Sequence, residues 1–288
     1  MRDDGPVDVL PPLRADVLRR ALLPPAGPVP RLEVVGETGS TNDDVLAGVR
    51  DDPSAWPDGA LLLAEHQSGG RGRLGRTWTA PARTSLTGTF VVRPGAAASG
   101  VGWLPLVVGL GVVRALRTDG GVQAWSKWPN DVLVAGPGRA AGPDGPRKVA
   151  GILVQATPDG QAVVVGVGLN VAQQVGQLPV ATATSLALAG GSTDRQALVV
   201  ALARELAQVV GRWRSWAGDA VGAGLADEVA QVCATLGRPV RVELPGATTL
   251  TGQAVRLDSD GALVVAGSGG QHRVLAGDVV HLRGARSG

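Results

Sequence analysis

The strongest periodic pattern in the chain lies in residues 194–217, where large apolar side chains recur every three or four positions. They are Leu198, Leu202, Leu206, Val209, Trp213 and Trp216. This spacing predicts one amphipathic helix with a single apolar face. Residues Trp103–Arg117 are apolar almost throughout, which predicts a second, buried helix. Its apolar stretch, Trp103–Leu116, is shorter than the ~20 residues that span a bilayer.

Two shorter helices are expected nearer the N-terminus. Leu13–Leu23 is amphipathic and is followed by a proline-rich connector. The next helix begins at Ser40 or Thr41, because either hydroxyl can cap a first turn. Asp43 and Asp44 then fall in that first turn, where the helix dipole favours acidic side chains.

Apolar and β-branched runs between the helices predict strands. The expected strands are Arg31–Val35, Ala60–Glu65, Ser85–Val92, Val122–Ser126, Asp131–Val134, Val149–Gln155 and Ala162–Asn170. Residues 136–146 are rich in glycine and proline, and we expect them to form the mobile end of a hairpin.

After Leu236 the pattern changes to five short strands separated by glycine-containing turns. They are Val240–Leu244, Leu250–Leu257, Ala262–Ala266, His272–Leu275 and Val279–Leu282. Five short strands in so few residues predict a small barrel. We therefore divide the chain into an N-terminal extension (1–30), a large domain (31–235) and a C-terminal barrel domain (236–288).

Composition narrows the class of protein. The chain has 288 residues, 44% of them hydrophobic, which describes a globular protein, and its formal net charge of +2 is too small to indicate nucleic-acid binding. The single cysteine, Cys233, cannot form an intrachain disulfide, and residues 1–30 lack a secretory signal pattern. We expect a cytoplasmic protein with no membrane attachment.

Lysine is almost absent. Of the 27 basic residues only Lys127 and Lys148 are lysines, and each lies in a short segment of unusual composition. A bias toward arginine explains the scarcity, and the two positions then reflect either chance or a need for a compact ammonium group that arginine cannot supply.

The densest candidate site is the loop Glu65–Trp78. Gly70, Gly72 and Gly75 satisfy G-x-G-x-x-G, but no helix follows them and no acid lies near residue 95, which excludes a dinucleotide fold. The loop also lacks the Gly-Lys pair of a Walker A motif.

The same loop places three arginines on a glycine-rich backbone, a combination suited to phosphate or carboxylate. A solvated basic surface loop and a nucleic-acid contact are the alternatives. We expect residues 69–76 to be mobile without a ligand and to become ordered on an anion.

Other conventional chemistries find no support. The three histidines are scattered, and there is no G-x-S-x-G elbow. Cys233 is expected in a core. An enzyme built from these residues would act by electrostatics and positioning, which suits transfer chemistry on phosphates.

Five segments occur in a fixed order along the chain: Gly39-Ser40-Thr41-Asn42, the loop Gln67–Arg76, Lys127-Trp128-Pro129-Asn130-Asp131, Lys148–Leu153 and Gly166–Asn170. This series resembles the biotin protein ligases over about residues 31–283. The resemblance implies an α+β fold, with a mixed sheet flanked by helices as in class II synthetases, followed by an SH3-like barrel.

The resemblance also implies two half-reactions. Biotin and MgATP would give biotinyl-5′-adenylate and pyrophosphate, and a lysine of a biotin carboxyl carrier domain of an acyl-CoA carboxylase would then take the biotinyl group. ATP and Mg²⁺ are the expected co-substrate and ion, and the metal ligands are unknown.

By the same resemblance the site residues fall into three groups. The expected biotin site comprises Ser40, Thr41, Asn42, Gln67, Gly70, Arg71, Gly72, Arg73, Lys148 and Gly151. The expected ATP site comprises Arg71, Arg76, Trp78, Asn130 and Asn170. The expected catalytic residues are Arg73, Lys148, Asp131 and Lys127, although Asp131 also suits a turn and Lys127 could anchor that turn. Trp125 and Trp128 are expected in the core.

Some biotin protein ligases carry an N-terminal winged helix-turn-helix and also repress transcription, whereas here about 30 residues precede the pattern. We therefore expect no specific DNA binding, and a monomer or weak homodimer. The alternatives are a lipoate protein ligase, a biotin-responsive repressor and a non-catalytic interaction module.

Overall fold

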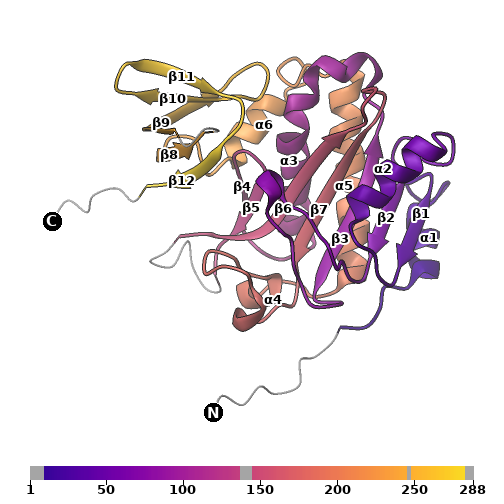
Figure 1. The fold of residues 1–288 in the computed structure, drawn as a ribbon. Coiled ribbons are helices and arrows are strands. Elements are labelled where there is room, and N and C mark those ends of the chain that lie inside the picture. The colour runs from indigo at the N-terminus through magenta and orange to yellow at the C-terminus, as the bar shows by residue number, and fades with distance from the viewer. Residues whose placement is uncertain (1–9, 137–144, 245–247, 283–288) are drawn as a thin grey trace, which may run out of the picture.

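A computed structural model describes residues 10–136, 145–244 and 248–282. Its centre is a seven-stranded mixed sheet (Figure 1). In spatial order the strands are β1 (Leu32–Val35), β2 (Leu61–Ala64), β3 (Ser85–Val92), β7 (Val163–Asn170), β6 (Arg147–Ala156), β5 (Asp131–Val134) and β4 (Ala124–Lys127). β1 and β2 run parallel, and every other neighbouring pair is antiparallel. The predicted mixed sheet is confirmed.

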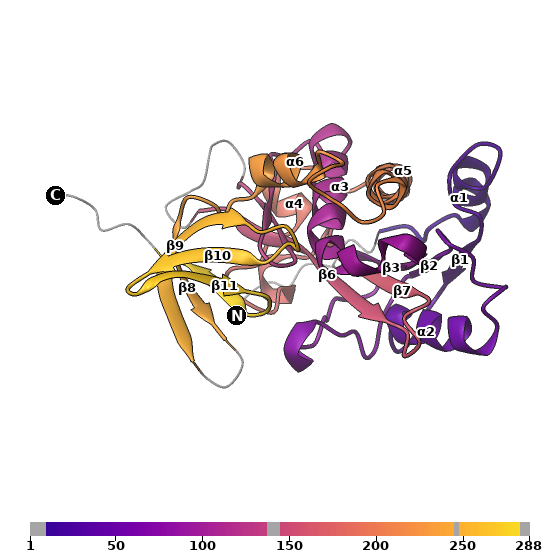
Figure 2. The same cartoon turned by 90° about the horizontal axis from the view of Figure 1, so that it is seen from above.

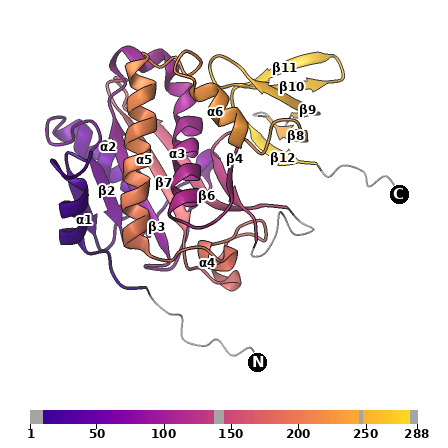
Figure 3. The ribbon, with the colours of Figure 1, turned by 180° about the vertical axis from the view of Figure 1, so that it is seen from behind.

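Helices cover both faces of this sheet unequally. α1 (Ala15–Leu22), α3 (Leu104–Thr118), α5 (Arg195–Ser215) and α6 (Leu225–Val232) lie on one face, and α2 (Thr41–Asp51) lies on the other (Figure 2, Figure 3). Short helical turns complete the domain: η1 (Arg73–Gly75), η2 (Gly95–Trp103), η3 (Val175–Gln177) and α4 (Leu186–Ala189). The face that carries α2 is the more open one.

The long helix α5 follows the predicted periodicity except at its end. Leu198, Leu202, Leu206, Val209 and Trp213 are buried. Trp216 was expected on the same face, but the helix ends at Ser215 and the Trp216 side chain is 53% exposed. The prediction was wrong there because a spacing pattern does not locate the last turn of a helix.

Local capping determines where α2 begins. The Ser40 hydroxyl accepts a hydrogen bond from the backbone N–H of Asp43, so Ser40 is the N-cap and Thr41 is the first helical residue. The acidic side chains of Asp43 and Asp44 stand in the first turn as predicted. This start places the Ser40–Asn42 segment at the open face of the sheet.

The residues before β1 belong to the same core as the sheet. Leu18 and Leu22 of α1 are fully buried. Behind them Arg195 of α5 donates to the carboxylate of Glu65 at 2.6 Å, and the Glu65 carboxylate also accepts from the backbone N–H of Leu13. This buried ion pair joins α1, the end of β2 and α5.

The C-terminal residues form a five-stranded antiparallel sheet beside β4 and β5 (Figure 1). Its strands are β8 (Pro239–Glu243), β9 (Thr249–Leu257), β10 (Leu263–Gly267), β11 (Gly270–Val274) and β12 (Asp278–His281), in the spatial order β11-β10-β9-β8-β12. This arrangement is consistent with the expected SH3-like barrel, with β11 and β12 at the ends of the order.

Two tryptophans of the large domain form hydrogen bonds with this sheet. The indole N–H of Trp103 donates to the carbonyl oxygen of Ser259 at 2.7 Å, and that of Trp128 donates to Gly261 at 3.1 Å. Both acceptors lie in the turn between β9 and β10. The core position predicted for Trp128 is confirmed, whereas Trp125 is only half-buried.

One helical stretch of the described chain, Gly95–Thr118, is long and apolar enough to cross a membrane, and 61% of its apolar window is buried inside the fold. It is the core helix α3 together with η2. The predicted hairpin end at 136–146 falls mostly outside the described residues.

Candidate active site

A cavity of about 470 Å³ opens on the α2 face of the large sheet. Its walls come from the start of α2, the loop 67–79, the β4–β5 hairpin, strands β6 and β7, and strands β8 and β12 of the C-terminal sheet. All five segments singled out in the sequence therefore meet around one space. Every residue predicted for the site lines it except Gly70, which packs behind the loop against Trp78 and Gln67.

Glycines in the sheet make room for this cavity. A Cβ at Gly168 would lie 2.4 Å from the indole of Trp78, and a Cβ at Gly166 would lie 2.3 Å from the amide oxygen of Asn42. A side chain at Gly168 would displace Trp78, and one at Gly166 would displace Asn42. The two glycines therefore leave β7 without side chains here, and the Trp78 ring lies against the strand backbone.

The end of the cavity beside α2 is a network of neutral hydrogen bonds. The backbone N–H and the hydroxyl of Thr41 both donate to Oε1 of Gln67, at 2.8 and 2.9 Å. This fixes the amide of Gln67, whose Nε2 has no acceptor among the described residues and is left to donate to a ligand. Thr89, fully buried in β3, donates to Oδ1 of Asn42 at 2.6 Å.

The side-chain amide of Asn42 is already hydrogen-bonded to other protein atoms. Its Nδ2 donates to Oε1 of Gln155 at 2.7 Å and to the carbonyl oxygen of Leu153 at 3.3 Å. Asn170 is similar: its Nδ2 donates to the carbonyl of Thr184, and its Oδ1 accepts from Gln173. Both amides line the cavity, but their N–H groups hold the wall in place.

The glycine-arginine loop is tied to three different elements. Arg71 forms an ion pair with Asp43 of α2 at 3.1 Å, and Nη1 of Arg73 donates to Oδ1 of Asn130 at 3.3 Å. Arg76 forms an ion pair with Asp278 of β12. The expected mobility of the empty loop stays a prediction.

The loop backbone bends sharply to make these contacts possible. Leu74 and Gly75 have φ values of 57° and 73°, in the left-handed region. Below this bend the backbone N–H of Gly72 donates to the carbonyl of Arg76 at 2.7 Å, and that of Trp78 donates to Gly70 at 2.8 Å. The bend spreads the three guanidinium groups around the cavity.

Charged side chains gather at the other end. Nζ of Lys148 lies 2.7 Å from Oδ1 of Asp131, with exposed side-chain fractions of 32% and 21%. The Lys148 ammonium also stands 5.8 Å from the ring centre of Trp78. Burial lowers the pKa of Lys127, Asp131 opposes this shift, and Lys148 adds to it.

The surroundings of Arg73 also shift the pKa of its guanidinium. Burial lowers the pKa of Arg73, and the carboxylate of Asp131 acts in the opposite direction. A guanidinium begins so far above neutrality that Arg73 remains a cation. Lys127, Lys148 and Arg73 together give this end of the cavity an excess of positive charge over Asp131.

Several wall residues carried no sequence signal. Glu243, Asp278, Val279 and Val280 come from the C-terminal sheet, and Pro179, Val180, Thr182 and Ala183 come from the segment before α4. No motif marks them, because they reach the cavity only through tertiary packing. The pairing of Arg76 with Asp278 could not have been predicted from either residue's neighbours.

The fold and the cavity define a class of ligase. Residues 38–170 match the Biotin/lipoate A/B protein ligase family, and residues 235–282 match the Biotin protein ligase C terminal domain. A biotin--[acetyl-CoA-carboxylase] ligase of Mycobacterium tuberculosis (strain ATCC 25618 / H37Rv) is 38% identical over 95% of this chain and 97% of its own length. The chain belongs to the biotin protein ligase family.

Two further comparisons cover part of the chain or the fold alone. The bifunctional ligase/repressor BirA of Bacillus subtilis (strain 168) is 32% identical, but the match covers 50% of this chain and 43% of that protein. Among solved structures, the Aquifex aeolicus biotin protein ligase in complex with biotin and ATP aligns with a TM-score of 0.67 at 24% identity, over 88% of this chain and all of that chain. This likeness shows that the two proteins share a fold.

Proposed function

We propose that this protein is a biotin–[acetyl-CoA-carboxylase] ligase, which activates biotin with ATP and transfers it to a lysine of a carboxylase carrier domain. The observation that carries the proposal is that five segments separated along the sequence line one cavity with a neutral polar end and a cationic end. Such a cavity suits a ligand with an uncharged polar head and a carboxylate tail. The 38% identical relative supports the same activity.

The neutral end is the proposed site for the ureido head of biotin. Nε2 of Gln67 is oriented to donate there, because Thr41 holds the other end of its amide. Ser40 and Thr41 stand at the N-terminus of α2, where backbone N–H groups favour ligand oxygens. We assign Asn42 to positioning, since both of its N–H groups are engaged.

At the cationic end the biotin carboxylate would attack the α-phosphorus of ATP, and pyrophosphate would leave. Both reactants are anions, so the site must neutralise their mutual repulsion and the charge of the transition state. We assign this role to Arg73 and Lys148, with Arg71 closing the loop over the valeryl chain and Gly72 and Gly151 admitting it close to the backbone. Trp78, Arg76, Asn130 and Asn170 form the proposed nucleotide wall.

In the second half-reaction the acceptor amine would attack the acyl carbon, AMP would leave with the bonding electrons, and the amine would lose a proton. Asp131 is the carboxylate at this end of the cavity and is the proposed proton acceptor or orienting group. Lys148 holds it at 2.7 Å, so the two residues act as one unit. Lys127 would add positive charge at the same end of the cavity.

The reaction implies Mg²⁺ bound with ATP. Within the described ranges no group of three His, Cys, Asp or Glu side chains could hold a metal, and the cavity carboxylates of Asp131, Asp278 and Glu243 are each paired with a cation. Nucleotide-dependent sites often hold Mg²⁺ through substrate phosphates and one or two carboxylates. The cavity therefore fits an ion that arrives on the triphosphate, where it would neutralise phosphate charge.

The proposal extends to organisation and partners. Residues 31–235 would form the catalytic domain, with residues 1–30 as an N-terminal extension and residues 236–288 as an SH3-like domain whose strands β8 and β12 supply one cavity wall. The described residues before β1 hold the helix α1 and a connector. A cytoplasmic monomer or weak homodimer fits this role.

Intact-mass spectrometry tests the activity directly. The full chain is incubated with MgATP, a carboxylase carrier domain, and either biotin or lipoate. A gain of one biotinyl group on the carrier, with no gain from lipoate, is the expected result. Modification by lipoate alone would assign the protein to the lipoate ligases, and no modification by either would refute ligation.

A further inference from the structure

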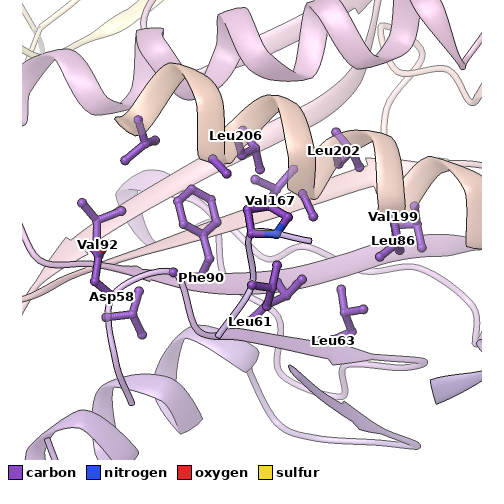
Figure 4. Close-up of a pocket in the computed structure, with 18 of the residues that line it drawn as sticks. Asp58, Leu61, Leu63, Leu86, Phe90, Val92, Val167, Val199, Leu202 and Leu206 are labelled. Carbon is purple, nitrogen blue, oxygen red and sulfur yellow. The ribbon is translucent and has the colours of Figure 1, made fainter. Parts of the chain in front are cut away.

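A second cavity lies on the opposite face of the large sheet, under α5. Its volume is about 300 Å³, and it separates α5 from strands β2, β3 and β7 (Figure 4). Apolar side chains point into it from both layers. Leu202 and Leu206 extend from the helix, while Leu61, Phe90 and Val167 extend from the strands. None of the sequence motifs predicted this space.

Small residues on α5 leave room for the cavity. On β3, Gly88 stands between Leu86 and Phe90 on the face toward α5, and the space beside it is taken by Leu63 of β2, whose Cδ2 would lie 2.6 Å from a Cβ at Gly88. On α5, Ala203 and Ala207 stand one turn apart and are too short to reach the sheet. Protein interiors are normally close-packed, and an empty apolar space destabilises a fold roughly in proportion to its volume. A ligand that fills the space would remove that penalty.

Charged groups occur at one end only. Arg214, in the last turn of α5, forms an ion pair with Asp58, and their side chains are 37% and 33% exposed, which places this end at the solvent. Asp58 also accepts the backbone N–H of Arg93 at 2.8 Å. The Arg93 guanidinium is held by the carbonyls of Pro53 and Trp56. The Arg93 guanidinium is thus held away from Asp58, and Arg214 is the guanidinium that lines the entrance within the described residues.

Arg214 keeps donors available for a ligand. A guanidinium has five N–H groups. Within the described residues, Nη1 of Arg214 contacts Asp58 and no other hydrogen bond of this side chain is recorded. A carboxylate pairs best with arginine through two parallel N–H groups. An entering anion can therefore reach unused donors of Arg214 at the entrance.

We propose that this cavity is a binding site for a medium-chain aliphatic carboxylate. The acyl tail would lie between α5 and the sheet against Leu206 and Phe90, and the carboxylate would bind Arg214 at the entrance. A mainly apolar lining with a few polar groups at one point is the usual composition of a small-molecule site. The site is distinct from the active-site cavity, although Gly88 and Val167 line both.

Carbon-13 NMR of octanoate labelled at its carboxyl carbon tests the proposal on the full chain. We expect saturable binding that Arg214→Gln weakens at least about tenfold, as for loss of a charge-assisted hydrogen bond. 1-Octanol, which has the same tail and no charge, should bind about tenfold more weakly than octanoate. Arg204→Gln, an exposed arginine on the same helix outside the cavity, is the matched control and should change nothing.

Two further variants separate ligand binding from a structural ion pair. Asp58→Asn removes the competing carboxylate but keeps an oxygen for the Arg93 N–H, so octanoate should bind more tightly. Loss of a structural ion pair would instead affect Asp58→Asn and Arg214→Gln in the same direction. Ala203→Met should fill the cavity and abolish octanoate binding, with the circular dichroism spectrum retained.

Three results would overturn the proposal. Equal binding of octanol and octanoate, unchanged in Arg214→Gln, would refute recognition of the carboxylate. Binding lost in Arg73→Ala but kept in Arg214→Gln would place octanoate in the active-site cavity. No saturable binding at millimolar octanoate would mean that the space is a packing void.

Discussion

Lys148 and Asp131 face each other from neighbouring strands β6 and β5, with Nζ 2.7 Å from Oδ1, at the cationic end of the active-site cavity. Each residue limits what the other can do. The lysine is held in place by the carboxylate, and the carboxylate is neutralised by the lysine. An anionic substrate therefore meets the Lys148 ammonium in a fixed position only while Asp131 is present.

Replacing Lys148 should reveal this dependence. In Lys148→Ala the carboxylate of Asp131 is left facing the biotin carboxylate, and we expect adenylate formation to fall roughly 100-fold to 1,000-fold. The pair is partly exposed, so the free energy of unfolding should change by less than about 1 kcal/mol. Pyrophosphate release without carrier measures the first half-reaction. The double variant Lys148→Ala/Asp131→Asn should recover part of the loss, and a strictly additive loss would contradict the coupling.

The ion pair between Arg76 and Asp278 should matter for ATP. Asp278→Asn removes the contact that fixes the loop to β12, and we expect the KM for ATP to rise about tenfold, with a smaller effect on the KM for biotin. Steady-state kinetics with each substrate varied in turn measures this. Asp258→Asn is the matched control, because Asp258 is paired with Arg273 in the same sheet away from the cavity. Equal effects of the two variants would refute a specific role.

Gly168→Ala tests the role of the glycines in β7. The added Cβ would lie 2.4 Å from the Trp78 indole, so Trp78 must move away from the cavity wall. We expect at least a roughly 100-fold loss in kcat/KM with cooperative unfolding preserved, since a displacement of about 1 Å can have such an effect. Gly36→Ala, where a Cβ would meet nothing within 4 Å, should retain full activity.

The buried ion pair of Glu65 and Arg195 should dominate local stability. The side chains are 10% and 3% exposed, so Arg195→Leu leaves an unpaired carboxylate inside the core. Urea denaturation should show a loss of about 3–5 kcal/mol. Arg20→Leu, which breaks the exposed pair with Asp16, should leave the urea midpoint almost unchanged. A small loss in Arg195→Leu would show that water reaches Glu65.

His281 predicts a dependence of stability on pH. Burial, together with Lys127 and Arg238, lowers the pKa of His281 to about 4 from the ordinary 6.5. Between these values the unfolded chain binds a proton that the folded chain does not, so stability falls as pH decreases from 6.5 toward 4. After discounting for solvent screening we expect about 1–2 kcal/mol. Urea midpoints at pH 5, 6 and 7 measure the slope, which His281→Gln should flatten.

Sequence patterns predicted features that depend on neighbouring residues in the chain and missed features that depend on tertiary packing. Ser40 could be predicted as a helix cap because capping involves only residues within one turn. The helix α6 was not predicted, although Leu225, Val229 and Val232 recur at helical spacing on its buried face. Asp278 was missed because it reaches the cavity only when two sheets pack together. Gly70 was placed in the site by its motif, yet its space is taken by Trp78 and Gln67.

The positions of the two lysines affect how far the protein can modify itself. A biotinyl-adenylate is an acylating agent that reacts with any accessible amine, and an enzyme that makes one exposes itself to self-modification. Both ε-amines of this chain line the cavity, one with its pKa lowered by burial and the other in an ion pair. The outer surface carries its positive charge on arginines, whose guanidinium groups stay protonated. Adenylate that escapes would therefore meet no surface lysine to acylate.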